Sequence, residues 1–193
     1  MPSRPAGPRD ERPCFRRRDV LGLALAPLIA SAAHADDDAA AMPPQPGDRL
    51  VHLTGPNKGQ AVRPDDLPLG GPQVQAYPAA PDGTVRSGSR LNLVILTRFD
   101  PAALAEATRA RAAGGVVAYS AVCTHQACPV NQWSKEQDAF VCSCHGSVFD
   151  PRDGAEVLDG PAPRRLPALG LKIVDGAVVV ASGFTGRVGG TQG

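Results

Sequence analysis

The sequence predicts an all-β protein, in which a small subdomain of loops is inserted into an antiparallel base of sandwich or barrel type. Three observations support this prediction. Aromatic residues make up only 4% of the 193 residues, whereas glycine and proline number 21 and 20, which is typical of loop-rich β proteins. From residue 50 onward, short apolar segments alternate with turn residues. Cysteine and histidine gather in two short boxes, at 123–128 and 142–147, and these mark the inserted subdomain at about 121–163.

The first 35 residues have the pattern of a secretory signal peptide. Arg16 and Arg17 stand before an apolar run over residues 21–33, and Ala33-His34-Ala35 has the form of an A-x-A cleavage site. The paired arginines resemble the twin-arginine type of export signal. The apolar run is shorter than the roughly 20 residues that a membrane-spanning helix needs, so we expect cleavage and a periplasmic location. The protein would be attached to a membrane only if this leader were retained as an anchor.

Residues 36–49 begin with three aspartates and contain several prolines, which predicts a disordered or extended linker ahead of a folded domain over 50–193. Within that domain, apolar or alternating segments predict strands at residues 50–53, 73–77, 91–98, 116–120 and 139–141. Near the C-terminus, Asp175 and Gly176 predict the tight turn of a hairpin over residues 171–180.

Two connections between these strands carry their own signals. Asp100 followed by Pro101 is a usual helix start, with the aspartate as N-cap, and it predicts a helix that ends at about residue 113. Leu104 and the alanines of this helix would face the core. Residues 131–138 are mostly polar and hold the single tryptophan, Trp133, and we expect them to form a loop between the two boxes.

Each box supplies ligands of the kind that soft metal ions bind. The first reads Cys-Thr-His-Gln-Ala-Cys over residues 123–128, and the second reads Cys-Ser-Cys-His-Gly-Ser over residues 142–147. The intervening residues are enough for a hairpin-like excursion that brings the boxes face to face. Cysteine and histidine at such spacings also form structural zinc sites, and plain disulfides are a further alternative. A cysteine nucleophile is not indicated, because it would need one reactive thiol rather than four.

Taken together, the pattern C-x-H-x-x-C…C-x-C-H-x-S resembles the Rieske [2Fe–2S] proteins of the disulfide-containing, high-potential type. The resemblance implies one Rieske-type [2Fe–2S] cluster per chain. It also implies that Cys123 and Cys142 ligate one iron and that His125 and His145 ligate the other. A zinc ion would need all four side chains at one tetrahedral point and would not explain the serine after the second histidine.

The resemblance also assigns roles around the cluster. Cys128 and Cys144 would form a disulfide that ties the two loops together. Ser147 matches the serine that tunes the potential in the family through a hydrogen bond to the cluster. A proline loop that covers the cluster from a third side and excludes water is matched by Gly160, Pro161, Ala162 and Pro163.

Two positions depart from the family pattern. Ala127 stands where the first box usually has glycine, so a methyl group must fit where the backbone often needs none. Phe149 stands where the members of highest potential have tyrosine, and it has no hydroxyl to donate. We therefore expect a potential below that of the quinol-oxidising members.

Histidine ligation itself raises the reduction potential. Two ferric ions are balanced by two sulfides and two thiolates, so the oxidised core is neutral and accepts an electron more readily than a four-cysteine core. Rieske centres accordingly lie at roughly −150 to +300 mV, against about −400 mV for plant-type ferredoxins. Ferric iron makes the outer ring nitrogens more acidic, so reduction should take up a proton at neutral to alkaline pH.

We therefore predict one-electron transfer in the periplasm by the small subunit of an oxidoreductase, rather than by a catalyst that acts alone. The chain most resembles the small subunit of arsenite oxidase. This resemblance implies two partners, a large molybdopterin-containing catalytic subunit and a c-type cytochrome or similar redox protein. The main alternative is the Rieske subunit of a cytochrome bc-type quinol-oxidising complex, which the proline loop favours. A zinc-stapled binding module is a further alternative, and the ferredoxins of ring-hydroxylating oxygenases are disfavoured by the export signal. A net charge of +1 gives no basis for nucleic-acid binding.

Overall fold

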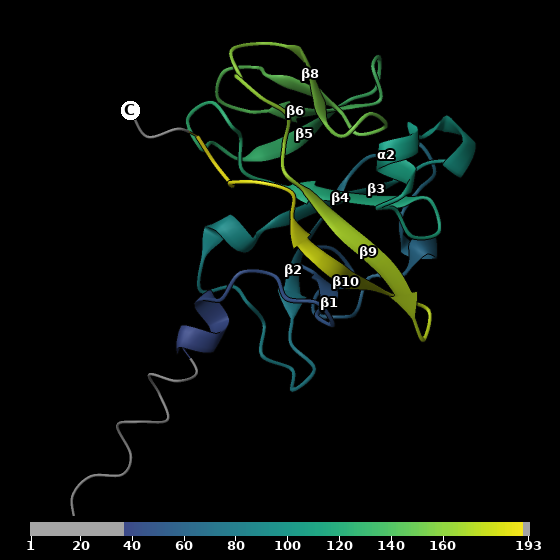
Figure 1. The fold of residues 1–193 in the computed structure, drawn as a ribbon, viewed down its shortest axis with the longest axis vertical. Helices are drawn as coiled ribbons and strands as arrows, with labels where there is room; N and C mark the ends of the chain where they lie inside the picture. Colours follow the sequence, from purple (N-terminus) through teal and green to yellow (C-terminus); the bar gives the residue numbers. More distant parts are fainter. Residues whose placement is uncertain (1–36, 191–193) are drawn as a thin grey trace, which may run out of the picture.

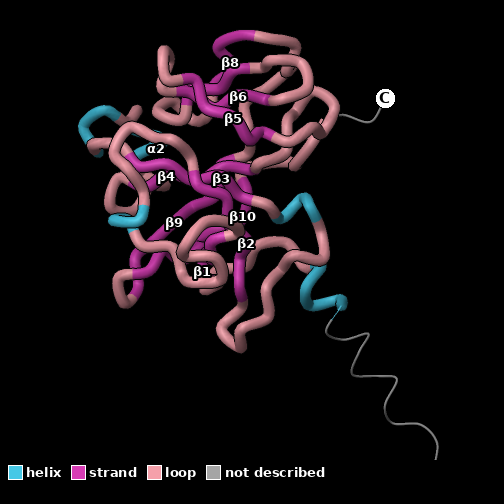
Figure 2. Tube along the Cα trace, turned by 180° about the vertical axis from the view of Figure 1, so that it is seen from behind, coloured by secondary structure: helices cyan, strands magenta, loops and turns pink. Residues whose placement is uncertain are grey.

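The computed structural model describes residues 37–190, so the expected signal peptide over residues 1–35 lies outside the described residues. The all-β class is confirmed, because six strands close into an antiparallel barrel and four more form a separate sheet. Figure 1 shows this sheet standing above the barrel, and Figure 2 shows from behind that loops make up much of the chain. In the part of the chain that is described, no helix is both long enough and apolar enough to cross a membrane.

The inserted sheet enters the chain between the fourth and fifth strands of the barrel. The barrel strands are β1 (Arg49–His52), β2 (Val74–Ala79), β3 (Val94–Arg98), β4 (Val116–Ser120), β9 (Ala168–Val174) and β10 (Ala177–Phe184). They follow one another around the barrel in the order β1-β10-β9-β4-β3-β2. The inserted sheet has the order β5 (Val130–Ser134), β6 (Ala139–Cys142), β7 (Val148–Asp150) and β8 (Glu156–Asp159). Short helical turns form at Pro64–Asp66, Arg90–Asn92, Pro101–Ala103 and α2 (Glu106–Arg109).

Alternation along the strands divides the apolar side chains between two cores. Val94 and Leu96 of β3 are fully buried inside the barrel, together with Val178 and Val180 of β10. Ile95, between the first two, is equally buried but belongs to the other core, because successive side chains of a strand point to opposite faces. Strand β4 alternates in the same way, with Val116 and Ala118 in the barrel core and Val117 and Tyr119 in the other core.

This second core joins the barrel to the inserted sheet. Tyr119 of β4 packs edge-on against Phe140 of β6, with ring centroids 5.9 Å apart, and Trp133 of β5 packs against Phe140 at 5.6 Å. The Tyr119 hydroxyl donates a hydrogen bond to the Pro151 carbonyl at 2.8 Å. The same core contains the cysteines that begin the two boxes, so the loops that carry them start from buried, fixed positions.

The predicted C-terminal hairpin is present as β9 and β10. Their turn places Asp175 and Gly176 at φ angles of 52° and 75°. Positive φ at both central residues defines the turn type that matches the twist of a tight hairpin, and Asp-Gly is a preferred pair for it.

The predicted helix over residues 100–113 is wrong as a single element. Asp100 does cap a helical turn, since its carboxylate accepts a hydrogen bond from the Ala102 N–H at 2.9 Å. Leu104 then adopts an extended backbone, with ψ of 135°, and its side chain enters the second core at 4% exposure. Only Glu106–Arg109 continue as helix. Burial of one leucine therefore overrides the local helix preference.

Two other expectations also need correction. Residues 131–138 do not form a loop throughout, because Val130–Ser134 pair with β6 as strand β5. A register shift after Val130 and two exposed polar residues obscured the alternation of apolar and polar residues in the sequence.

The expected linker over 36–49 is packed where it is described. Residues 37–41 are helical, the Ala39 carbonyl accepts from Arg86 at 3.0 Å, and the Met42 carbonyl accepts from Asn92 at 2.7 Å.

A buried ion pair anchors this N-terminal segment to the barrel. Arg86 donates two hydrogen bonds to the Asp48 carboxylate, from Nε at 2.6 Å and from Nη2 at 3.0 Å. The two residues are 6% and 1% exposed. The hydrogen bonds that Arg86 donates to the Asp48 carboxylate raise the pKa of the Arg86 guanidinium above its usual value, which favours its charged form.

Replacing Arg86 with methionine should lower the free energy of unfolding by about 3–5 kcal/mol, because it leaves the Asp48 carboxylate buried without its partner. The measurement is denaturant unfolding of both proteins. Arg49→Met is the matched control, since Arg49 pairs with Asp175 at 3.6 Å on the surface, where the side chains are 53% and 81% exposed. That control should lose less than about 1 kcal/mol. Equal losses in the two variants would contradict the assignment.

Candidate metal centre

The first box folds into a closed loop directly after β4. The Cys123 N–H donates to the Cys128 carbonyl at 2.8 Å, and the Ala127 N–H donates back to the Cys123 carbonyl at 3.0 Å. Ala127 has a φ of 57°, in the left-handed region that favours glycine. The methyl group is therefore accommodated, but at a position where an alanine is strained by about 1–2 kcal/mol.

The second box joins β6 to β7 and repeats this hydrogen-bonding pattern. The Cys142 N–H donates to the Ser147 carbonyl at 2.9 Å, and the Gly146 N–H donates back to the Cys142 carbonyl at 3.1 Å. Gly146 has a φ of 72° and takes the place that Ala127 has in the first loop. The two cysteines thus occupy equivalent positions in two similar loops, whereas the histidines follow them by two residues in one loop and three in the other.

The four predicted ligands form two pairs of different character. The Cys123 and Cys142 side chains are each 1% exposed and lie within hydrogen-bonding contact of one another. The His125 and His145 rings lie edge to face, with their Nδ1 atoms 3.3 Å apart. His125 is half-buried and His145 is exposed. The thiol pair therefore belongs to the protein interior, while the imidazole pair is open to solvent.

Burial raises the pKa of the Cys123 thiol above its usual value, and the neighbouring Cys142 thiol raises it further. Hydrogen bonds from the His125 backbone N–H and from the Ser147 hydroxyl act in the opposite direction. The cluster-free Cys123 thiol is therefore protonated at neutral pH, and iron binding must release its proton. The same two hydrogen bonds favour the thiolate form that ligates metal.

A disulfide closes the two loops over this site. Cys128 and Cys144 are joined, with their Cα atoms 6.2 Å apart, within the usual range for such a bond. These residues are the pair that the resemblance assigns to the bond. The remaining cysteines of the described chain, Cys123 and Cys142, are free.

The proline loop packs directly on the second box. The Ala162 N–H donates to the Ser147 Oγ at 3.1 Å, and Ser147 is completely buried. A Cβ atom added at Gly160 would lie 2.5 Å from the Ser147 Cα, so only glycine permits this approach. Ser147 therefore accepts a hydrogen bond from the proline loop and donates one toward Cys123, and each bond polarises the other.

The donor set suits a dinuclear centre better than a single ion. Among residues 37–190, no three His, Cys, Asp or Glu side chains converge on one point where an ion could bind. A structural zinc site needs four such ligands at one point. In a Rieske centre, two cysteines hold one iron and two histidines hold the other. The separate thiol and imidazole pairs fit that arrangement.

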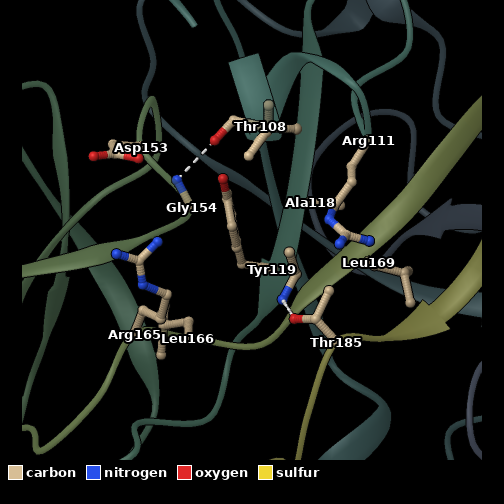
Figure 3. Close-up of a pocket in the computed structure, with 13 residues that line it drawn as sticks. Thr108, Arg111, Ala118, Tyr119, Asp153, Gly154, Arg165, Leu166, Leu169 and Thr185 are labelled. Carbon is tan, nitrogen blue, oxygen red and sulfur yellow. Dashed lines mark hydrogen bonds between the residues drawn. The ribbon is translucent and has the colours of Figure 1, made fainter. Parts of the chain in front are cut away.

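A cavity of about 210 Å³ is lined by residues of α2, β4 and β9 and of the turn between β7 and β8, several of which Figure 3 labels. Tyr119 forms part of its wall, and burial raises the pKa of that phenol. The Gly154 N–H donates to the Thr108 Oγ at 2.8 Å across it, which ties the inserted segment to α2. None of the four predicted ligands lines this cavity, so it is a junction between the two units and not the metal centre.

Sequence reasoning missed the residues that hold the first box from outside. Thr124 is fully buried, and its hydroxyl donates to the Arg164 carbonyl at 2.5 Å. Arg90 donates from Nη1 to the Ala127 carbonyl at 2.6 Å. These partners are 40 and 37 residues apart along the chain, so no short motif could have revealed them.

Comparison with known proteins agrees with this geometry. Residues 77–170 match the family described as the Rieske [2Fe-2S] domain, a range that contains both boxes and the proline loop. The chain therefore carries a Rieske [2Fe–2S] domain. The cofactor of this domain is a [2Fe–2S] cluster.

Two of the similar proteins are named as Rieske subunits of larger complexes. The Rieske iron–sulfur subunit of the cytochrome bc1 complex of Streptomyces coelicolor is 29% identical over 183 residues, which cover 86% of this chain and 49% of the relative. A putative respiratory nitrate reductase subunit Rieske of Haloferax mediterranei is 45% identical over 76 residues, which cover 39% of this chain and 34% of the relative. The chain thus spans about half or less of the length of these two relatives. Among solved structures, the plasma membrane Rieske protein of Synechocystis is 27% identical, with a TM-score of 0.36 and coverage of 55% of this chain and 84% of that one.

Replacing Ser147 with alanine should lower the reduction potential by about 30–100 mV. A hydrogen bond to a charged group contributes about 1.5–3 kcal/mol, and only the part that differs between the oxidised and reduced cluster changes the potential. For one electron, a tenfold change in the equilibrium constant of reduction corresponds to about 59 mV. The measurement is a redox titration followed by EPR. Ser143→Ala is the control, because the exposed Ser143 hydroxyl donates only to the Pro129 carbonyl, at 3.3 Å. An unchanged potential in Ser147→Ala would remove Ser147 from its assigned role.

Proposed function

We propose that this chain is the electron-transfer subunit of a larger oxidoreductase outside the cytoplasm, with Cys123, Cys142, His125 and His145 as the cluster ligands. One observation carries the proposal: two buried thiols in contact, combined with two imidazoles whose Nδ1 atoms lie 3.3 Å apart at the solvent side. When bound, the cluster supplies a one-electron store of high potential.

The surrounding residues have separate tasks in this proposal. Cys123 and Cys142 anchor the site in the second core and keep water from its inner side. The imidazoles form the outward edge, where a redox partner can approach. The Cys128–Cys144 bond holds the two loops in register.

A quinol-oxidising complex of the cytochrome bc1 type is the first candidate for the parent complex. Several relatives whose matches cover 72% or more of this chain are named as bc1 Rieske subunits, among them one from Streptomyces coelicolor and one, 30% identical, from Mycobacterium tuberculosis. The proline loop on Ser147 agrees with this candidate. A large catalytic subunit and a cytochrome would then be the partners.

An arsenite-oxidase-like complex, with a molybdopterin subunit, is the second candidate. None of the relatives named above is an arsenite oxidase. Its support comes from the chain itself, in which the apolar run over residues 21–33 is short for a membrane span and Phe149 offers no hydroxyl to the site. Both features favour an exported carrier of lower potential.

Purification of the tagged protein from its native host separates these candidates. The periplasmic and membrane fractions are prepared gently, and haem and molybdenum are measured in the proteins that co-purify. Haem in the membrane fraction supports the quinol-oxidising complex, whereas molybdenum with a large soluble subunit supports the second candidate. N-terminal sequencing of the mature chain shows whether the leader is removed at Ala35. A protein recovered without a partner would contradict its role as a subunit.

A further inference from the structure

The segment that follows β10 crosses from the barrel to the first box. In Figure 1 the end of the described chain, drawn in yellow, rises from β10 toward the inserted sheet. Gly189 is buried there, and its carbonyl accepts a hydrogen bond from Arg164 Nη2 at 2.6 Å. A Cβ atom added at Gly189 would lie 3.5 Å from the Ala127 Cβ and 3.6 Å from Val122, in ordinary van der Waals contact. This segment therefore packs against the first box.

Gly190 lies directly on the backbone of a predicted ligand. A Cβ atom added to Gly190 would clash with the His125 carbonyl oxygen and would lie 3.3 Å from the Gln126 Cα. The φ angle of Gly190 lies outside the left-handed region, so its backbone conformation does not require glycine. The requirement is close approach alone, since any side chain would push the two backbones apart.

Arg164 connects this segment to the box from the other side. Its guanidinium holds Gly189, and its own carbonyl accepts the Thr124 hydroxyl at 2.5 Å, next to His125 in the chain. Arg90 holds the Ala127 carbonyl at the far end of the same loop. The exposed turn of the box is thus fixed by partners that come from three distant parts of the chain.

We propose that residues 187–190, which we call the brace, together with Arg164, position His125 for ligation. Arg164 acts here as a positioning residue through the brace and Thr124, and does not touch the cluster. The inference rests on the proposed function, since it concerns how firmly one of its ligands is held. His125 is half-exposed and lies in a loop whose tip, Gln126, is exposed. The position of its imidazole ring therefore depends on the contacts that hold the backbone of this loop.

Gly190→Ala tests the brace directly. The variant should show a changed EPR line shape and should lose its cluster to a chelator about 10-fold faster or more, as is usual when the support of a metal ligand is removed. Gly186→Ala is the matched control, because Gly186 lies in the same segment, outside the left-handed region, with no atom within 4 Å of an added Cβ. The control should behave as the unmodified protein. Identical behaviour of the two variants would overturn the proposal.

Arg164→Met provides a second test that does not depend on the cluster. Amide hydrogen exchange of residues 123–128 in the cluster-free protein should become faster, whereas Arg109→Met, at an exposed position of α2 outside the brace, should leave it unchanged. Unchanged exchange in Arg164→Met would also overturn the brace. A protein that binds no cluster at all would instead contradict the proposed function, so the two failures are distinguishable.

Discussion

Alanine at His125 or at His145 should abolish the Rieske-type EPR signal while leaving the chain folded. Each substitution removes one of the two nitrogen ligands proposed for one iron. The other described histidine, His52, lies in β1 of the barrel, bonded to Asp66 at 3.1 Å, and cannot replace it. His145 is exposed and lies outside both cores, so the free energy of unfolding of the cluster-free protein should change by less than about 0.5 kcal/mol. EPR of the reduced proteins and denaturant unfolding provide the two readouts.

His52→Ala is the control for these variants and should give the opposite result. His52 is 6% exposed, and its loss should destabilise the barrel while the EPR signal is unchanged. A third variant, His145→Cys, replaces a neutral ligand by an anionic one and should move the potential toward that of four-cysteine clusters. An unaltered EPR signal in His125→Ala or His145→Ala would show that the ligands are wrongly assigned.

Replacing Cys128 and Cys144 together by serine should lower the free energy of unfolding by roughly 3 kcal/mol. The bond joins residues 16 apart, and closing a loop of about this length contributes roughly this much. For a domain of this size the melting temperature should fall by about 6–12 °C. The variant should still bind a cluster, because neither residue is a predicted ligand, but it should lose the cluster faster and have a lower potential.

The two single variants serve as controls for this prediction. Cys128→Ser and Cys144→Ser should each lower the melting temperature about as much as the double variant, because either one removes the whole bond. Additive effects would mean that the two cysteines act separately. Retention of wild-type cluster stability in all three variants would show that the disulfide does not hold the loops in place.

The sequence predicted the all-β class and the strands that carry the two boxes, because both depend on local patterns. β1, β4 and β6 lie within a residue or two of their expected positions. The hairpin of β9 and β10 could be predicted because Asp175-Gly176 suits one turn type. Ser147 lies against the proline loop, as the hydrogen bond from Ala162 shows, and its expected effect on the potential stays a prediction.

What the sequence could not predict depends on distant contacts. The helix expected after Asp100 is interrupted because Leu104 is drawn into a core built by strands far along the chain. The first box is supported by Arg90, Arg164 and Gly190. These residues lie in no recognisable motif, and they contact the box only when the chain is folded. Arginine and glycine are common on loops, so residue type alone does not distinguish them.

The central claim is that two cysteines and two histidines hold a [2Fe–2S] cluster. It is tested most directly by iron and acid-labile sulfide analysis combined with electron–nuclear double resonance of the reduced protein labelled with ¹⁵N-histidine. We expect iron and sulfide in equal amounts, two of each per chain, with magnetic coupling to nitrogens of both His125 and His145. A cluster without histidine coupling, or zinc in place of iron and sulfide, would contradict the account.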